Sequence, residues 1–222
     1  MAVELGVGKI SVDNFLELAL LNNAAKAKNK TVEILLRVTP GIECHTHEYI
    51  QTGHLDSKFG FDLTQVNDAV ELILDEYKNL KLVGVHAHIG SQIFETQIYY
   101  DEVEVLLKEI SIIQEKFNIK LEHINLGGGL GIKYTDADCP PSVNEIAEKI
   151  ISSVHENSKK YGIEEPHIYI EPGRSIVGTA GVSLYTVGSS KQVPKGKKYV
   201  AVDGGMADNP RPSLYQAVYT AD

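Results

Sequence analysis

Short runs of β-branched and other apolar residues alternate with longer segments of helical periodicity over residues 10–172. Each short run is bounded by Gly, Pro or Asp, which is typical of strands that end in turns. This alternation predicts parallel βα units. Five strands are expected, at Lys9–Val12, Val32–Val38, Leu82–Ile89, His123–Leu126 and His167–Ile170. A closed β/α barrel has more strands than this, so the pattern predicts an incomplete barrel.

Three of the longer segments place apolar side chains at spacings of three and four, the pattern of an amphipathic helix. They cover residues 64–77, 101–117 and 142–161. Pro141 lies just before Ser142 and suits a helix start there. Near the N-terminus, Asn14 followed by Glu17 resembles a capping box and predicts another helix.

The character of the chain changes after Gly178. Residues 181–190 and 197–205 have the composition of strands joined by a turn-rich segment, and no helical stripe is expected after them. We therefore predict an α/β fold in two parts. Residues 1–177 form a partial (β/α)8 barrel of the TIM type, and residues 178–222 begin a C-terminal β-sheet domain.

Composition narrows the class of protein. The chain has 222 residues, of which 43% are hydrophobic and 23% charged, as in a globular domain. Its formal charge of -9 argues against a general nucleic-acid partner. No apolar stretch is long enough for a membrane span and the start lacks a secretory signal, so a cytoplasmic protein without a membrane partner is expected. Cys44 and Cys139 lack metal-ligand spacing and are expected to be free thiols.

The segment GVHAHIGSQ carries two histidines, His86 and His88, at the carboxyl end of a predicted strand. Side chains alternate along a strand, so both histidines face the same side. Active sites of β/α barrels lie at this end of the strands. The pair could also be core histidines that bond backbone carbonyls, or a metal clamp that needs further ligands from later strands. The next strand offers no such ligand, and no metal site is predicted.

The next two strands end in groups that suit an anionic ligand. One runs into Gly127–Gly129, where glycines let backbone N–H groups approach a phosphate closely, although a tight turn alone would also use glycine. The other ends in Glu171-Pro172-Gly173-Arg174, in which the carboxylate and the guanidinium could form a structural ion pair. Taken together, these strand ends indicate a site for a phosphorylated cofactor whose ring meets an acid.

Five motifs occur in order along the chain: TGHLDSKFGF, GVHAHIGSQI, INLGGGLGIKY, EPGRSIVGTAG and VDGGMADNPRPSLYQA. As a set they resemble the diaminopimelate decarboxylases, which have an alanine racemase-like barrel and use pyridoxal phosphate. HIGSQ, GGG and EPGR are shared more loosely with ornithine and arginine decarboxylases.

The resemblance implies roles for the residues of these motifs. His88 stacks on the pyridine ring, and Glu171 faces the pyridine nitrogen and keeps it protonated; these two residues are the expected catalytic groups. The remaining cofactor contacts are expected around the phosphate, from Ser91, Gly128, Gly129, Pro172, Gly173 and Arg174.

The expected substrate has an amino-acid group at each end, and recognition of its carboxylates requires planar, bidentate donors. Arg174, Arg211 and Tyr215 occupy the matching positions in EPGR and RPSLY. Arg211 lies between two prolines that stiffen the backbone, although an ordinary surface loop would have the same sequence.

Two family segments have no counterpart in these 222 residues. One is a Tyr-Ala-x-Lys-Ala-like strand with the Schiff-base lysine; Lys58 matches a different barrel position. The other is a Cys-Glu-Ser-x-Asp-like segment that completes the active site across a homodimer interface. The resemblance thus implies the middle of a decarboxylase, inactive alone, whose unpaired sheet edges favour aggregation and poor stability.

The leading functional hypothesis is decarboxylation of meso-2,6-diaminopimelate to L-lysine and carbon dioxide. An arginine in RPSLY favours this substrate, because the far end of ornithine carries an amine instead of a carboxylate. The alternatives are a decarboxylase of the ornithine, arginine or lysine type, a non-catalytic remnant of the fold, and a metal-dependent barrel hydrolase that uses His86 and His88.

Overall fold

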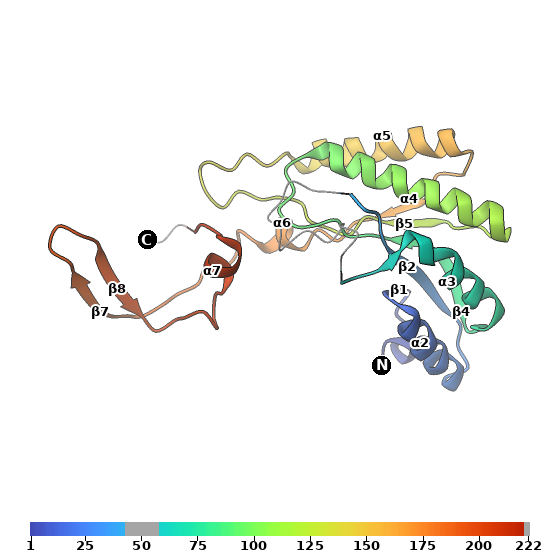
Figure 1. Cartoon of the computed structure of the whole chain (residues 1–222), viewed down its shortest axis with the longest axis horizontal. Helices are drawn as coiled ribbons and strands as arrows, with labels where there is room; N and C mark the ends of the chain where they lie inside the picture. The colour runs from blue at the N-terminus through green and yellow to red at the C-terminus, as the bar shows by residue number, and fades with distance from the viewer. Residues whose placement is uncertain (43–57, 220–222) are drawn as a thin grey trace.

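A parallel sheet forms the centre of the protein in the computed structural model, which describes residues 1–42 and 58–219 (Figure 1). The strand order is β1-β2-β4-β5-β6, and β3 pairs with β2. The strands are β1 (Lys9–Val12), β2 (Val32–Thr39), β3 (Phe61–Asp62), β4 (Leu80–His86), β5 (His123–Asn125) and β6 (His167–Tyr169). The parallel α/β fold and all five predicted strands are confirmed.

Apart from one-residue differences at strand ends, the strand prediction is wrong in two respects. Strand β4 covers Leu80–His86 instead of Leu82–Ile89, because the chain leaves the sheet after His86 and forms a loop over the strand ends. The sequence also gave no indication of β3, because two residues are too few to show an alternating pattern.

Helices cover one face of the sheet. They are α2 (Phe15–Ala27), α3 (Leu63–Asp75), α4 (Thr96–Phe117) and α5 (Val143–Tyr161), and α4 and α5 lie side by side (Figure 1). Capping boxes start α3 at Asp62 and α5 at Ser142. At the start of α2, Asn14 Oδ1 accepts the N–H of Glu17 as predicted, but the Glu17 carboxylate returns to the N–H of Asp13.

The two faces of the sheet differ in chemistry. Leu36, Val85 and Ile124 are buried under the helices and belong to one apolar core that also includes Leu106 and Ile110 of α4. The opposite face, which would line a barrel, carries mostly polar side chains. They include Lys9, Glu33, Arg37, His86, His123, Asn125 and His167.

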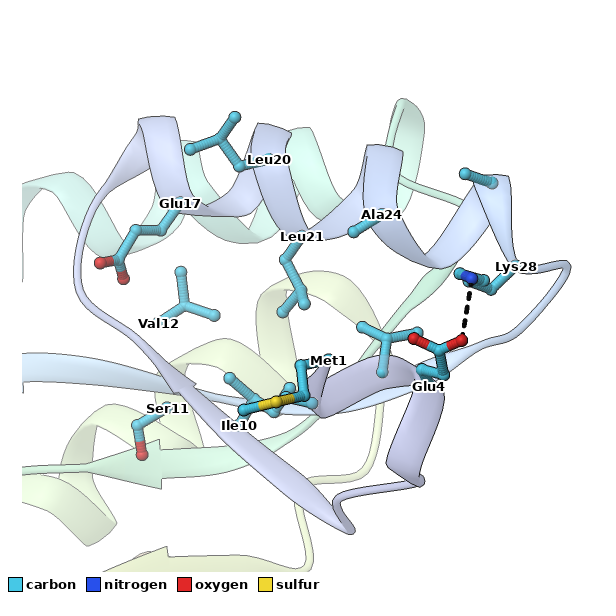
Figure 2. Close-up of a pocket in the computed structure, with 13 residues that line it drawn as sticks. Met1, Glu4, Ile10, Ser11, Val12, Glu17, Leu20, Leu21, Ala24 and Lys28 are labelled. Atoms are coloured by element: carbon cyan, nitrogen blue, oxygen red, sulfur yellow. Dashed lines mark hydrogen bonds and ion pairs between the residues drawn. The ribbon is translucent and has the colours of Figure 1, made fainter.

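The sheet ends at β1 and β6, which have a strand neighbour on one side only among the described residues. Beside β1, a pocket of about 540 Å³ opens between β1, α2 and the short helix α1 (Ala2–Leu5) (Figure 2). Apolar side chains such as Ile10, Val12 and Leu21 line it, and an ion pair of 3.2 Å between Glu4 and Lys28 lies at its rim. All three residues of β6 are exposed.

The remaining elements follow β6. They are α6 (Gly173–Val177), an antiparallel hairpin of β7 (Val187–Gln192) and β8 (Lys198–Val202), and α7 (Arg211–Tyr215). The hairpin projects away from the sheet, and its residues are exposed (Figure 1). The predicted strand pair is thus present, but its first strand begins at Val187 instead of residue 181. After the hairpin the described chain forms α7, a single turn that is too short to show the helical stripe that the sequence analysis did not find there.

No helix in the described ranges is both long enough and apolar enough to cross a membrane. Cys139 is an exposed free thiol. Cys44 and the first six residues of the TGHLDSKFGF motif lie outside the described residues.

Candidate active site

Three loops meet where β4, β5 and β6 end, as expected for parallel strands. Backbone hydrogen bonds join the first two loops: Ile93 N–H donates to Gly129 O at 2.9 Å, and Gly131 N–H donates to Ile93 O at 3.1 Å. The side-chain amide of Gln92 adds two more bonds to the backbone of Ile132, at 2.6 and 3.1 Å. Glu171 N–H then joins the third loop to Gly127 O at 2.5 Å. The strand ends therefore form one connected unit.

The glycines of the second loop allow this close approach. A Cβ on Gly128 would lie 2.2 Å from Glu171 O, and one on Gly129, whose φ is +92°, would lie 2.4 Å from Gly90 O. Any side chain at either position would force the loops apart. Close packing of the loops is therefore a sufficient reason for glycine at these two positions. The phosphate contacts expected for Gly128 and Gly129 stay predictions.

His88 is held in one orientation by the second loop. Its Nδ1 accepts the N–H of Gly128 at 3.1 Å, which places the proton of the neutral ring on Nε2. Burial lowers the pKa of His88, with a smaller lowering from the charge of Arg37. His88 therefore presents a neutral imidazole ring.

Glu171 meets polar groups of the two preceding strands. Its Oε1 accepts a hydrogen bond from Asn125 Nδ2 at 2.9 Å and lies 3.5 Å from His86 Nε2. The Glu171 side chain is still 55% exposed, so a ligand can reach its carboxylate. The sequence analysis did not identify Asn125 as a site residue; its only signal was a polar residue in a short buried strand.

His86 is buried under this carboxylate. Burial lowers its pKa to about 4, and the nearby charge of Glu171 opposes this shift. At neutral pH the ring is uncharged. Within residues 1–42 and 58–219, no group of three or more His, Cys, Asp or Glu side chains is placed to hold a metal ion.

Arg174 connects two of the loops. Its Nη1 donates to Tyr134 Oη at 2.6 Å, and its Nη2 donates to Ser91 Oγ at 2.9 Å. The Ser91 hydroxyl keeps its own proton for donation to a ligand. Gly173 N–H donates to Glu171 O at 2.9 Å, so this predicted phosphate donor has an internal acceptor. Pro172 is the N-cap of α6 and lacks an N–H.

Arg211 and Tyr215, the other predicted substrate residues, lie on α7. The Arg211 guanidinium is 5.7 Å from the centroid of the Tyr215 ring. The segment after α7 reaches the site through Tyr219, whose ring packs edge-on against Tyr134 at 5.8 Å. Tyr134 therefore contacts both Arg174 and the chain that follows Arg211.

A second polar cluster beside His86 was missed by the sequence analysis. Arg37 Nη1 lies 3.5 Å from Asp13 Oδ1, which also accepts the N–H of Gly60 at 3.0 Å. The Arg37 guanidinium lies 4.6 Å from the centroid of the Phe59 ring. Lys58 contacts the same ring, with its Nζ 4.9 Å from the Phe59 centroid.

These groups fit a phosphorylated pyridine cofactor. Ser91 and Arg174 offer the O–H and N–H donors that a phosphate accepts, and His88 offers a neutral ring. Glu171 offers an accessible carboxylate for a ring nitrogen, with one oxygen already held by Asn125. The donor set matches the chemistry of pyridoxal phosphate.

Comparisons with known proteins agree with this site. Residues 1–178 match the family model described as pyridoxal-dependent decarboxylase, pyridoxal binding domain. The chain is 51% identical over 223 residues to diaminopimelate decarboxylase of Bacillus subtilis (strain 168), covering all of this chain and 51% of that protein. It is 50% identical over 210 residues to the Synechocystis enzyme of the same name, covering 95% of this chain and 44% of that protein.

Among solved structures, diaminopimelate decarboxylase from M. jannaschii in complex with L-lysine has a TM-score of 0.85 and 35% identity. The match covers 99% of this chain and 50% of that one. The chain thus spans about half the length of the relatives it matches. These findings confirm the resemblance seen in the motifs and indicate pyridoxal phosphate as the cofactor. The chain belongs to the pyridoxal-dependent decarboxylases, and residues 1–178 correspond to their pyridoxal binding domain.

Proposed function

We propose that this chain takes part in the decarboxylation of meso-2,6-diaminopimelate to L-lysine and carbon dioxide. The observation that carries the proposal is 51% identity along the whole chain to a diaminopimelate decarboxylase. The loops at the ends of β4, β5 and β6 support it, because they gather groups suited to each part of the cofactor.

Within this proposal, each residue at the strand ends has a role. His88 packs on the face of the pyridine ring, and Glu171 holds a proton at the ring nitrogen. Ser91, the Gly128–Gly129 backbone and the Pro172–Arg174 turn hold the phosphate. When bound, pyridoxal phosphate supplies an electron-withdrawing ring for the carbon that loses carbon dioxide.

Substrate choice is proposed to depend on Arg174, Arg211 and Tyr215. A guanidinium at Arg211 suits the carboxylate at the far end of diaminopimelate and repels the amine of ornithine. Tyr134 contacts both Arg174 and Tyr219, and Tyr219 follows α7. This link supports a location of Arg211 and Tyr215 near Arg174.

The remaining parts of the proposal concern organisation. We propose a domain boundary near residue 178, where the family match ends and the exposed hairpin segment begins. A homodimer in the cytoplasm is proposed, without nucleic-acid or membrane partners. The exposed apolar side chains of β6 and β8, such as Ile168 and Val200, support a need for further protein contacts.

The test is a chimera in which residues 1–222 replace the matching half of the Bacillus subtilis enzyme. The remaining half supplies the Schiff-base lysine that the resemblance requires. We expect the chimera to release lysine from meso-diaminopimelate and to leave ornithine unreacted. In the chimera, Arg211→Ala is expected to lower kcat/KM for diaminopimelate by about 30-fold or more.

The outcomes separate the parts of the proposal. Turnover of ornithine in place of diaminopimelate, or unchanged kcat/KM in Arg211→Ala, would contradict the substrate assignment. A folded chimera that binds pyridoxal phosphate but releases no carbon dioxide from any diamino acid would contradict the reaction and favour a non-catalytic remnant.

A further inference from the structure

We propose that Asn125 is a positioning residue that holds the Glu171 carboxylate for the cofactor ring, an inference that rests on the proposed function. Asn125 is the last residue of β5 and is buried between β4 and β6. In the sheet it is in register with His86 on one side and Tyr169 on the other. Its side chain therefore lies under the point where Glu171 leaves β6.

Two hydrogen bonds fix which way the Asn125 amide points. Its Oδ1 accepts the N–H of Gly127 at 2.9 Å, and its Nδ2 donates to Glu171 Oε1 at 2.9 Å. A flipped amide would place its NH₂ group against the Gly127 N–H and its oxygen against the carboxylate, and both contacts would be repulsive. The Gly127 backbone thus aims the donor at Glu171.

The donor is neutral, and this matters for the chemistry. An arginine or lysine in its place would neutralise the carboxylate, whereas an amide orients one oxygen and leaves the negative charge available. Glu171 Oε2 accepts no hydrogen bond from the described part of the chain, so it is the oxygen that can meet a ring nitrogen.

His86 lies near the same oxygen but is the weaker candidate. Its Nε2 is 3.5 Å from Glu171 Oε1, against 2.9 Å for Asn125 Nδ2. Because burial keeps the imidazole neutral, it adds no cationic partner. Asn125 therefore supplies the closer of the two contacts on Oε1.

Asn125→Asp separates positioning from folding. Aspartate has nearly the same shape and still accepts the N–H of Gly127, but when ionised it cannot donate to Glu171. Two carboxylates about 3 Å apart cannot both ionise easily, so the pair would retain a proton and lose affinity for a protonated ring. The matched control is Asn22→Asp in α2, since Asn22 Oδ1 also accepts a backbone N–H, from Asn79 at 3.2 Å.

The experiment uses the chimera loaded with pyridoxal phosphate. Asn125→Asp is expected to weaken pyridoxal phosphate binding and to lower kcat, each by about 10- to 100-fold, with KM for diaminopimelate little changed. The visible absorption band of the bound cofactor should also change its pH dependence between pH 5.5 and 9. Asn22→Asp should leave the absorption band, its pH dependence and the cofactor affinity at parent values.

A double-mutant cycle keeps the test sharp if Asn125→Asp proves unstable. If Asn125 acts through Glu171, then Asn125→Ser should weaken cofactor binding in the parent chimera but have little further effect in a Glu171→Gln background. Parent-like cofactor affinity and spectrum in both Asn125 variants, additive effects in the cycle, or an equal loss in Asn22→Asp would overturn the proposal.

The same data distinguish this inference from the proposed function. A parent chimera that binds pyridoxal phosphate without turning over diaminopimelate contradicts the reaction, while affinity and absorption still report on Asn125. A parent chimera that binds no pyridoxal phosphate overturns both.

Discussion

Strands β5 and β6 are neighbours in one sheet and both end in the candidate site, yet their surroundings differ. Ile124 of β5 and Ile168 of β6 are direct partners in register, and their side chains face the same side. Ile124 is 0% exposed, because the helices cover it, whereas Ile168 is 37% exposed at the open edge. The same residue type in the same register is therefore core in one strand and surface in the next.

This difference affects the site, because Glu171 comes from the exposed strand. Its position depends on bonds to β5 and the loop that follows it: Asn125 donates to its carboxylate, and its own N–H donates to Gly127 O. The buried half of the sheet thus acts as the rigid support, and the open half carries the reactive carboxylate.

The largest expected effect comes from truncating the two matched isoleucines. Ile124→Ala is expected to lower the free energy of unfolding by about 2–5 kcal/mol, because it leaves a cavity in the core. Ile168→Ala should cost roughly 1 kcal/mol in the chain, since part of that side chain is already in water. Urea denaturation followed by circular dichroism measures both free energies of unfolding. An equal loss in the two variants would contradict the difference in burial between β5 and β6.

A second effect concerns His86, which is neutral and buried at the end of β4, on the polar face of the sheet. Its folded pKa of about 4 is below its ordinary value of 6.5, so the unfolded chain binds a proton first as the pH falls. The stability linked to His86 is therefore complete above pH 6.5 and decreases toward pH 4, by up to about 3 kcal/mol. His86→Gln should remove this part of the acid destabilisation, as measured by unfolding free energies at pH 7.5 and 4.5. His155→Gln, at an exposed site, is the control, and identical pH dependence in the parent and His86→Gln would refute the prediction.

A third effect comes from Glu102 in α4, which is fully buried and whose two carboxylate oxygens have no hydrogen-bond partner among the described residues. Burial raises its pKa well above the usual value. The buried carboxyl group is tolerated while it is protonated, so the folded state is not penalised below pH 4.5. As the pH rises toward the folded pKa of Glu102, the unfolded chain ionises more readily and the folded state loses stability. Glu102→Leu should therefore stabilise the chain at pH 8 by about 1–3 kcal/mol, with a smaller gain at pH 4.5. Glu164→Leu, at an exposed position, should change little; a destabilised Glu102→Leu would mean that the carboxyl group has a partner.

The smallest effect concerns a helix start. Ser142 caps α5 through a reciprocal bond pair with Glu145, and Ser142→Ala is expected to lower the free energy of unfolding by about 1 kcal/mol. Ser152→Ala, on the exposed side of the same helix, should have almost no effect. Thermal unfolding compares the two variants, and equal shifts in Tm would argue against the cap.

Much of this architecture is readable from sequence because it depends on local pattern. The short apolar run at Lys9–Val12 located β1 to the residue. Pro141 indicated the helix start at Ser142, and the glycines after β5 were also visible as a local pattern. Strand order then explains why residues as distant as His88 and Glu171 share one site.

The missed features depend on contacts between distant residues. Asn125 meets Glu171 across 46 positions and Tyr134 meets Arg174 across 40, and neither partner marks the other in the sequence. The ion pair of Asp13 and Arg37 has the same character. Burial was unpredictable for a related reason: β5 and β6 have similar sequences, and only the covering helices make them different.

The most direct test of the account is the stoichiometry of pyridoxal phosphate bound to the chimera and to its Gly128→Ala variant. A Cβ at Gly128 would meet Glu171 O at 2.2 Å, whereas a Cβ at Gly181 has no neighbour within 4 Å, so Gly181→Ala is the matched control. The account predicts about one cofactor per chain in the parent and in Gly181→Ala, and nearly complete loss in Gly128→Ala with the circular dichroism of the fold retained. A parent chimera without cofactor, or Gly128→Ala with parent-like binding, would contradict a cofactor site built from the ends of β4, β5 and β6.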